Sequence, residues 1–196
     1  MSKYQSTKVI ELGSCAFRQW RASHSHCHYI HGYQLKAKLW FGGESLDNKN
    51  WIVDFGGLKS LKEALQYQFD HTTCVAGDDP ELDLFKEMER RGVIQLRIMP
   101  DGVGIERTAE YVWGVANDHV KQLTNGRCWC EKVEVFEHED NSATYCENNQ
   151  TQNFALPPES VVRVEDVAIP TPPERDRAAP LYCKTDKSLA DILVGR

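Results

Sequence analysis

The segment from Tyr33 to Phe41 constrains the fold more than any other part of the sequence. Apolar and polar positions alternate in it, with Tyr33, Leu35, Ala37, Leu39 and Phe41 on one side and Gln34, Lys36 and Lys38 on the other. Successive side chains of a β-strand point to opposite faces, so a period of two predicts a strand with one buried face. Such half-buried strands are typical of antiparallel sheets. We therefore predict an antiparallel sheet that contains this strand.

Helical periodicity is clearest over residues 106–123, where apolar side chains recur at helical spacing: Ala109, Val112, Trp113, Ala116, Val120 and Leu123. A second helix is predicted over 57–68, and a third between Asp79, as the capping residue, and Gly92. Extended segments are predicted over 8–22, 93–99, 128–137 and 142–145. This mixture of elements predicts an α+β fold.

The last fifty residues differ in composition from the rest. Six of the eight prolines lie there, at positions 157, 158, 170, 172, 173 and 180, and apolar periodicity is weak before Leu189. We predict a folded domain over 1–146 and an irregular, Pro-rich C-terminal extension over 147–196.

Charge and hydropathy exclude some classes of partner. The formal net charge is −6 and no basic cluster is present, which argues against a nucleic-acid partner. No apolar run reaches membrane-spanning length, and the first residues lack the pattern of a signal peptide. We therefore expect a cytoplasmic protein with no membrane partner, whose seven cysteines are reduced.

Four histidines fall within eight positions, at His24, His26, His28 and His31, with Cys27 among them. Imidazole is the commonest protein ligand for transition metals. In an extended segment the side chains of His24, His26 and His28 would point the same way. If this segment pairs with the strand that begins at His31, three imidazoles could converge on a zinc ion (Zn²⁺) and leave one coordination position open. The alternative is an exposed loop that is rich in histidine.

Other polar residues have two interpretations each. Cys27 alternates away from His24 and His26, which favours a nucleophile or acid–base role over metal binding. Asp70 and His71 form either a proton-relay pair or a polar contact at a helix end. Glu137 is either a surface charge on an edge strand or an anchor for a polar ligand. Thr108 and Glu110 belong either to a helix start or to a ligand pocket.

Six motifs in one order resemble the 6-pyruvoyl- and 6-carboxytetrahydropterin synthase family. They are Trp20 to His24, Cys27 to Tyr33, Asp54 to Lys59, Phe69 to His71, Arg107 to Glu110, and Val133 to Glu137. The resemblance implies the tunnelling fold (T-fold), an antiparallel sheet with helices packed on one face. It also implies a homo-oligomer, commonly a hexamer, and a zinc ion held by three histidines.

The resemblance assigns roles to particular residues. Cys27 would be the general base, Asp70 and His71 a proton relay, and Glu137 the anchor of the pterin ring. Thr108 and Glu110 would be pocket contacts. The family's His-Gly-His reads His31-Gly32-Tyr33 here, so the predicted zinc ligands are His24, His26 and His31. Tyr33 is an alternative third ligand.

The implied function is that of a zinc-dependent lyase. It would convert 7,8-dihydroneopterin triphosphate to 6-carboxy-5,6,7,8-tetrahydropterin, a precursor of 7-deazaguanines such as queuosine. Family branches that form 6-pyruvoyl tetrahydropterin or a folate precursor from the same substrate remain alternatives. Two further hypotheses are a non-catalytic pterin- or purine-binding relative and a zinc hydrolase. The hydrolase is disfavoured because no glutamate base accompanies paired histidines at helical spacing.

Overall fold

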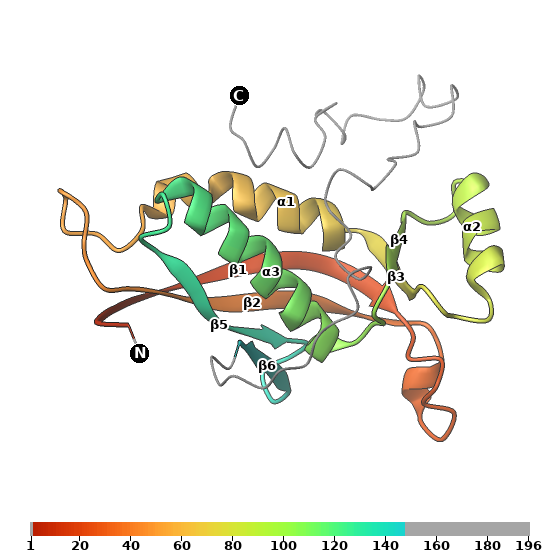
Figure 1. The fold of residues 1–196 in the computed structure, drawn as a ribbon. Helices are drawn as coiled ribbons and strands as arrows, with labels where there is room; N and C mark the ends of the chain where they lie inside the picture. The colour runs from red at the N-terminus through yellow and green to blue at the C-terminus, as the bar shows by residue number, and fades with distance from the viewer. Residues whose placement is uncertain (1, 148–196) are drawn as a thin grey trace, which may run out of the picture. The chain divides into compact units, whose positions relative to one another are not determined.

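A computed structural model describes residues 2–147. In this part of the chain six strands form one sheet in the order β4-β3-β1-β2-β5-β6 (Figure 1). The strands are β1 (Tyr4–Phe17), β2 (His31–Gly43), β3 (Thr72–Ala76), β4 (Leu96–Met99), β5 (Trp129–Phe136) and β6 (Ser142–Cys146).

The predicted α+β class is confirmed, and the sheet is mixed rather than wholly antiparallel. Neighbouring strands among β1, β2, β5 and β6 pair antiparallel, whereas β3 runs parallel to β1 and β4 runs parallel to β3. Sequence reasoning missed β3 because all five of its residues are buried, so it carries no alternation of apolar and polar positions.

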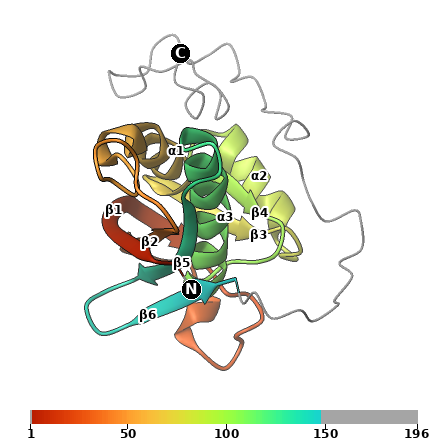
Figure 2. The same cartoon turned by 60° about the vertical axis from the view of Figure 1, so that its left-hand side comes forward.

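Two long helices, α1 (Lys59–Phe69) and α3 (Ile105–Leu123), cover one face of the sheet (Figures 1 and 2). The shorter α2 (Leu82–Arg90) lies beside β3 and β4 at the sheet edge. Two 3₁₀ turns, η1 (His26–His28) and η2 (Phe55–Leu58), complete the regular elements. This placement of helices on one face of the sheet agrees with the arrangement expected for the tunnelling fold.

The start of α2 differs from the prediction. Asp79 does not cap the helix; its carboxylate accepts a hydrogen bond from the Glu81 amide at 2.9 Å in a turn, and the helix begins at Leu82. The same carboxylate forms an ion pair with Arg18. Arg18 is distant in the sequence, so no local sequence pattern reveals this contact.

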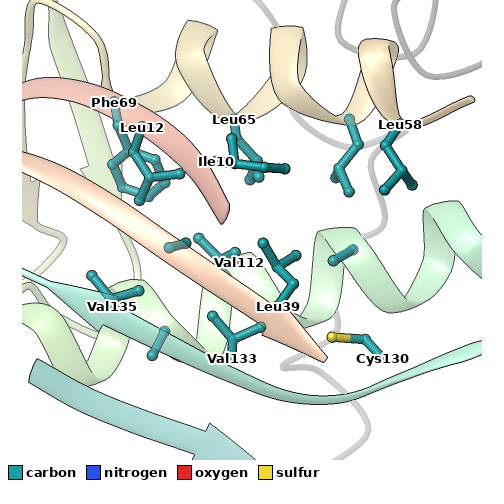
Figure 3. Close-up of a cluster of buried hydrophobic side chains, with 14 of the residues drawn as sticks. Ile10, Leu12, Leu39, Leu58, Leu65, Phe69, Val112, Cys130, Val133 and Val135 are labelled. Carbon is teal, nitrogen blue, oxygen red and sulfur yellow. The ribbon is translucent and has the colours of Figure 1, made fainter. Parts of the chain in front are cut away.

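The hydrophobic core fills the space between the sheet and the helices α1 and α3 (Figure 3). The alternation in β2 is confirmed, since Leu35, Ala37, Leu39 and Phe41 are 0% exposed. They share the core with Leu65 of α1 and with other buried residues: Ile10, Leu12, Leu61, Val112, Val120, Val133 and Val135. Removal of these apolar surfaces from water is the main stabilising term of the fold.

The predicted C-terminal extension, 147–196, lies outside the described residues except for Glu147. Among the helices that the structure describes, none has the length and apolar character needed to cross a membrane.

His119 in α3 makes stability depend on pH. Its side chain is buried, and its Nε2 lies 3.1 Å from the Gly57 carbonyl oxygen. Burial lowers the pKa of His119, against the opposing effect of that hydrogen bond. The unfolded chain, with an ordinary histidine pKa of about 6.5, therefore binds a proton that the native state resists.

We expect the free energy of unfolding to fall as the pH drops below about 6.5, and to level off below the native pKa of His119. His119→Gln keeps a donor for Gly57 but does not titrate, so its stability should depend less on pH in this window. Urea unfolding of both proteins between about pH 5 and 8 measures the difference. Equal slopes would contradict the prediction.

Candidate active site

Four predicted site residues, His24, His26, Cys27 and His31, lie at the end of the sheet where β1 ends and β2 begins. The connection between these strands, residues 18–30, is called the histidine loop below. Phe17 pairs with His31 across the two strands, and the side-chain amide of Gln19 lies beside Gly104, the residue before α3. This end of the sheet therefore joins the histidine loop to the start of α3.

Cys27 is half-buried in the short turn η1. Its amide donates to the Ser25 hydroxyl oxygen at 3.2 Å, and its carbonyl oxygen accepts from the Gln19 amide at 2.8 Å. His28 Nδ1 lies 2.7 Å from the Trp20 carbonyl oxygen. Backbone contacts within the loop thus determine where the Cys27 thiol lies.

The predicted zinc ligands do not form a ligand set in this arrangement. Within residues 2–147 no group of three or more His, Cys, Asp or Glu side chains is placed to hold a metal ion. The expectation assumed an extended segment, but His26 lies in η1, a 3₁₀ turn, and His24 lies in the turn before it. His31 Nδ1 lies 2.8 Å from the Tyr29 carbonyl oxygen. Zinc at His24, His26 and His31 thus stays a prediction that this geometry does not fit.

Tyr33 of β2 lies near two histidines, His31 and His138. Its ring is 5.5 Å from that of His31 and 6.4 Å from that of His138. Burial raises the pKa of Tyr33, and the charges of Glu137 and Cys27 raise it further. The phenol is therefore a neutral hydrogen-bond donor near pH 7.

Glu137 follows directly after β5, and its side chain is only 18% exposed. Its Oε1 accepts a hydrogen bond from the Asn141 side-chain amide at 3.0 Å, which orients the carboxylate. His138 is the next residue, and its Nε2 lies 2.8 Å from the same Asn141 amide. Sequence reasoning missed His138 and Asn141; the polar run directly after the strand was the only available signal.

Asp70 and His71 are placed side by side at the end of α1. Asp70 Oδ1 lies 2.9 Å from His71 Nδ1 and accepts from the Ser14 amide at 3.1 Å. A side chain at Gly13 would clash with this carboxylate, since a Cβ there would lie 2.2 Å from Asp70 Oδ1. His71 adopts a left-handed φ of 57°, which is uncommon for a residue other than glycine. The pair is therefore held in one geometry by the irregular part of β1.

The Asp70–His71 pair does not meet Cys27 within this chain. In the described part of the chain neither residue has a hydrogen bond or ion pair with Cys27, and the His71 side chain is 83% exposed. The 2.9 Å contact between the two side chains suits a proton relay, and that role stays a prediction.

Thr108 and Glu110 lie in the first turns of α3. Thr108 is buried and its amide donates to the Gly104 carbonyl oxygen at 2.9 Å. Glu110 pairs with Arg107 at 2.6 Å. Both residues thus act in the helix start, and their pocket contacts stay predictions.

A cleft of about 460 Å³ lies at the opposite end of β1 and β2. It is lined by Tyr4, Gln5, Ser6, Leu46, Asn50, Trp51, Ile52, Val53, Asp54 and Phe55. None of the predicted catalytic, binding or metal residues lines it, so it does not define the site described above.

The chain matches the family model of 6-pyruvoyl tetrahydropterin synthase over residues 10–148. Among solved structures it is similar to an uncharacterized protein from Wolinella succinogenes, with a TM-score of 0.62 and 18% identity over 74% of this chain and 98% of the other. It is also similar to 6-pyruvoyl tetrahydropterin synthase from Plasmodium vivax, with a TM-score of 0.52 and 16% identity over 73% and 98%. No curated protein matches it.

The two structural likenesses agree with the observed sheet and its helix-covered face. The family model covers well over half of the 196 residues and includes every predicted site residue. The chain therefore belongs to the 6-pyruvoyl tetrahydropterin synthase family.

Proposed function

We propose that the protein is a lyase of pterin metabolism that converts 7,8-dihydroneopterin triphosphate to 6-carboxy-5,6,7,8-tetrahydropterin. Family membership supports a pterin substrate. The observation that carries the proposal is the Glu137 carboxylate, which is only 18% exposed and is oriented by the Asn141 side-chain amide at 3.0 Å. A thiol and an oriented carboxylate at one end of the sheet are the two groups that this chemistry needs first.

Glu137 would anchor the pterin ring. The guanidine-like edge of a pterin presents parallel N–H donors, and a carboxylate accepts two such donors in one plane. The Asn141 amide holds one carboxylate oxygen in place, which reduces the cost of ordering the side chain on binding.

Cys27 would act as the general base that removes a proton from the side chain of the bound substrate. Its contacts with Ser25 and Gln19 orient it before the substrate arrives. The Asp70–His71 pair would carry the proton onward, because the carboxylate fixes the tautomer of the imidazole.

The relay requires a second copy of the chain. Asp70 and His71 are solvent-accessible and have no hydrogen bond or ion pair with Cys27 in the described part of one chain. We propose a homo-oligomer, hexameric as in the family pattern, in which the pair of one copy meets the thiol of another.

Incubation of the purified protein with 7,8-dihydroneopterin triphosphate, followed by mass spectrometry of the products, tests the function. We expect 6-carboxy-5,6,7,8-tetrahydropterin. A 6-pyruvoyl product or a folate precursor would place the protein in another branch of the family, and unchanged substrate would overturn the lyase proposal. Parallel reactions with added zinc and with a chelator show whether turnover needs a metal.

A binding-only relative is the second candidate, favoured by the absence of a three-ligand group among the described residues. It predicts that the pterin binds and quenches protein fluorescence but is recovered intact, with or without zinc. Metal analysis of the wild type beside His31→Ala shows whether His31 contributes to zinc binding at all.

A further inference from the structure

The histidine loop is held by polar contacts rather than by a hydrophobic core. None of residues 18–30 is buried, and η1 contains no buried residue. The hydrophobic effect therefore stabilises this loop little. Its conformation must depend on the hydrogen bonds and ion pairs that join it to the rest of the protein.

One of these contacts is a buried ion pair between Arg18 and Asp79. Arg18 Nε donates to Asp79 Oδ2 at 2.8 Å, and a terminal guanidinium nitrogen donates to Oδ1 at 2.5 Å. The Asp79 side chain is 0% exposed and that of Arg18 only 15%. Burial alone would raise the pKa of Asp79, but the bonds from Arg18 and the Glu81 amide hold it below its usual range. The carboxylate is therefore charged and fully paired.

The neighbouring residue extends the same anchor. Asp78 accepts a hydrogen bond from Trp20 Nε1 at 3.2 Å and forms an ion pair with Arg21. The Arg21 guanidinium lies 4.4 Å from the centre of the Trp20 ring. The two adjacent carboxylates of the β3–α2 turn thus bind three of the first four residues of the histidine loop.

Contacts inside the loop connect this anchor to the thiol. The Gln19 amide, between Arg18 and Trp20, donates to the Cys27 carbonyl oxygen at 2.8 Å. The Trp20 carbonyl oxygen lies 2.7 Å from His28 Nδ1. Cys27 and the next residue, His28, are therefore each linked through one hydrogen bond to Gln19 and Trp20, which lie between the two arginines that Asp79 and Asp78 bind.

We propose that the Asp78–Asp79 turn positions Cys27, with Arg18 and Asp79 as positioning residues for the reaction. The anchoring of the loop by this turn does not depend on the proposed function. The part that concerns turnover rests on the proposed function. A bidentate guanidinium–carboxylate pair suits this task because it restricts direction as well as distance.

Hydrogen exchange and alkylation test the anchoring without any substrate. In Asp79→Asn, amides of residues 19–30 should exchange about 10- to 100-fold faster, as expected for loss of a charge-assisted hydrogen bond. Cys27 should be alkylated faster by iodoacetamide, measured on its own peptide by mass spectrometry. Asp83→Asn, which removes the exposed pair with Lys86 in α2, is the matched control and should change neither rate.

A double variant separates positioning from general stability. Asp79→Asn alone leaves Arg18 as a partly buried unpaired charge, so the melting temperature should fall. Arg18→Gln combined with Asp79→Asn removes both charges and should recover the melting temperature, while exchange in the histidine loop stays fast. If the double variant restored loop protection fully, or if Asp79→Asn left it unchanged, the proposal would be overturned.

Turnover gives the final comparison. In the double variant kcat should fall while KM changes little, because Glu137 and Asn141 lie outside the histidine loop and its anchor. A rise in KM with kcat unchanged would contradict the positioning of Cys27. If the wild type shows no turnover, the proposed function fails, and the exchange and alkylation measurements still decide whether the turn anchors the loop.

Discussion

Replacement of Cys27 with alanine is expected to lower kcat by about 10²–10⁴-fold, the usual contribution of a positioned general acid or base. The Cys27 thiol is the group of the histidine loop to which the proposal assigns proton removal, and its charge also raises the pKa of Tyr33. Its removal leaves the Glu137 carboxylate and the Asn141 contact intact. Steady-state turnover of the proposed substrate measures the effect.

Two controls make the Cys27 result specific. Pterin binding to Cys27→Ala, followed by fluorescence, should stay close to that of the wild type, because the anchor is unchanged. Cys146→Ala alters an exposed cysteine in β6 and should leave kcat within about twofold, as expected for a surface change remote from the chemistry. Wild-type turnover in Cys27→Ala would remove the thiol from the mechanism.

Replacement of Leu65 with alanine is expected to cost about 2–5 kcal/mol of stability. Leu65 is 0% exposed on α1 and packs in the core between the helix and the sheet (Figure 3). Deletion of its side chain loses buried apolar surface and leaves a cavity that the strands cannot easily fill, because sheet and helix geometry are rigid. Urea unfolding measures the change in free energy.

Lys62→Ala in the same helix is the matched control for Leu65→Ala. Lys62 is exposed, and alanine favours helices, so its free energy of unfolding should change by no more than about 0.5 kcal/mol. Equal losses in both variants would mean that helix propensity, and not core packing, determines the stability of α1.

The elements predicted well from the sequence are those whose burial follows a period. The alternation through β2 placed Leu35 and Leu39 in the core, and the helical spacing over 106–123 corresponds to α3 at Ile105–Leu123. In each case one face of the element contacts the core, so apolar residues recur in the sequence with the period of that element. All five residues of the short strand β3 are buried, so its sequence shows no such period.

The candidate site was predictable in its residue types but not in its contacts. Matching motifs identified Asp70 and His71, and the structure places them 2.9 Å apart. The same reasoning assumed that the histidines lie in an extended strand, whereas His26 and Cys27 lie in a 3₁₀ turn. Side-chain direction in a loop follows its long-range contacts, and no period in the sequence encodes them.

The sequence by itself determined the α+β class, the periodic helices and strands, and the chemical groups available at the site. Only the tertiary structure decided which of these groups meet. It places His26 in a 3₁₀ turn, orients Glu137 with Asn141, and joins Arg18 to Asp79 across 61 positions of chain. The physical reason is that periodicity reports burial, a local property, whereas hydrogen-bond and ion-pair partners depend on how distant segments pack.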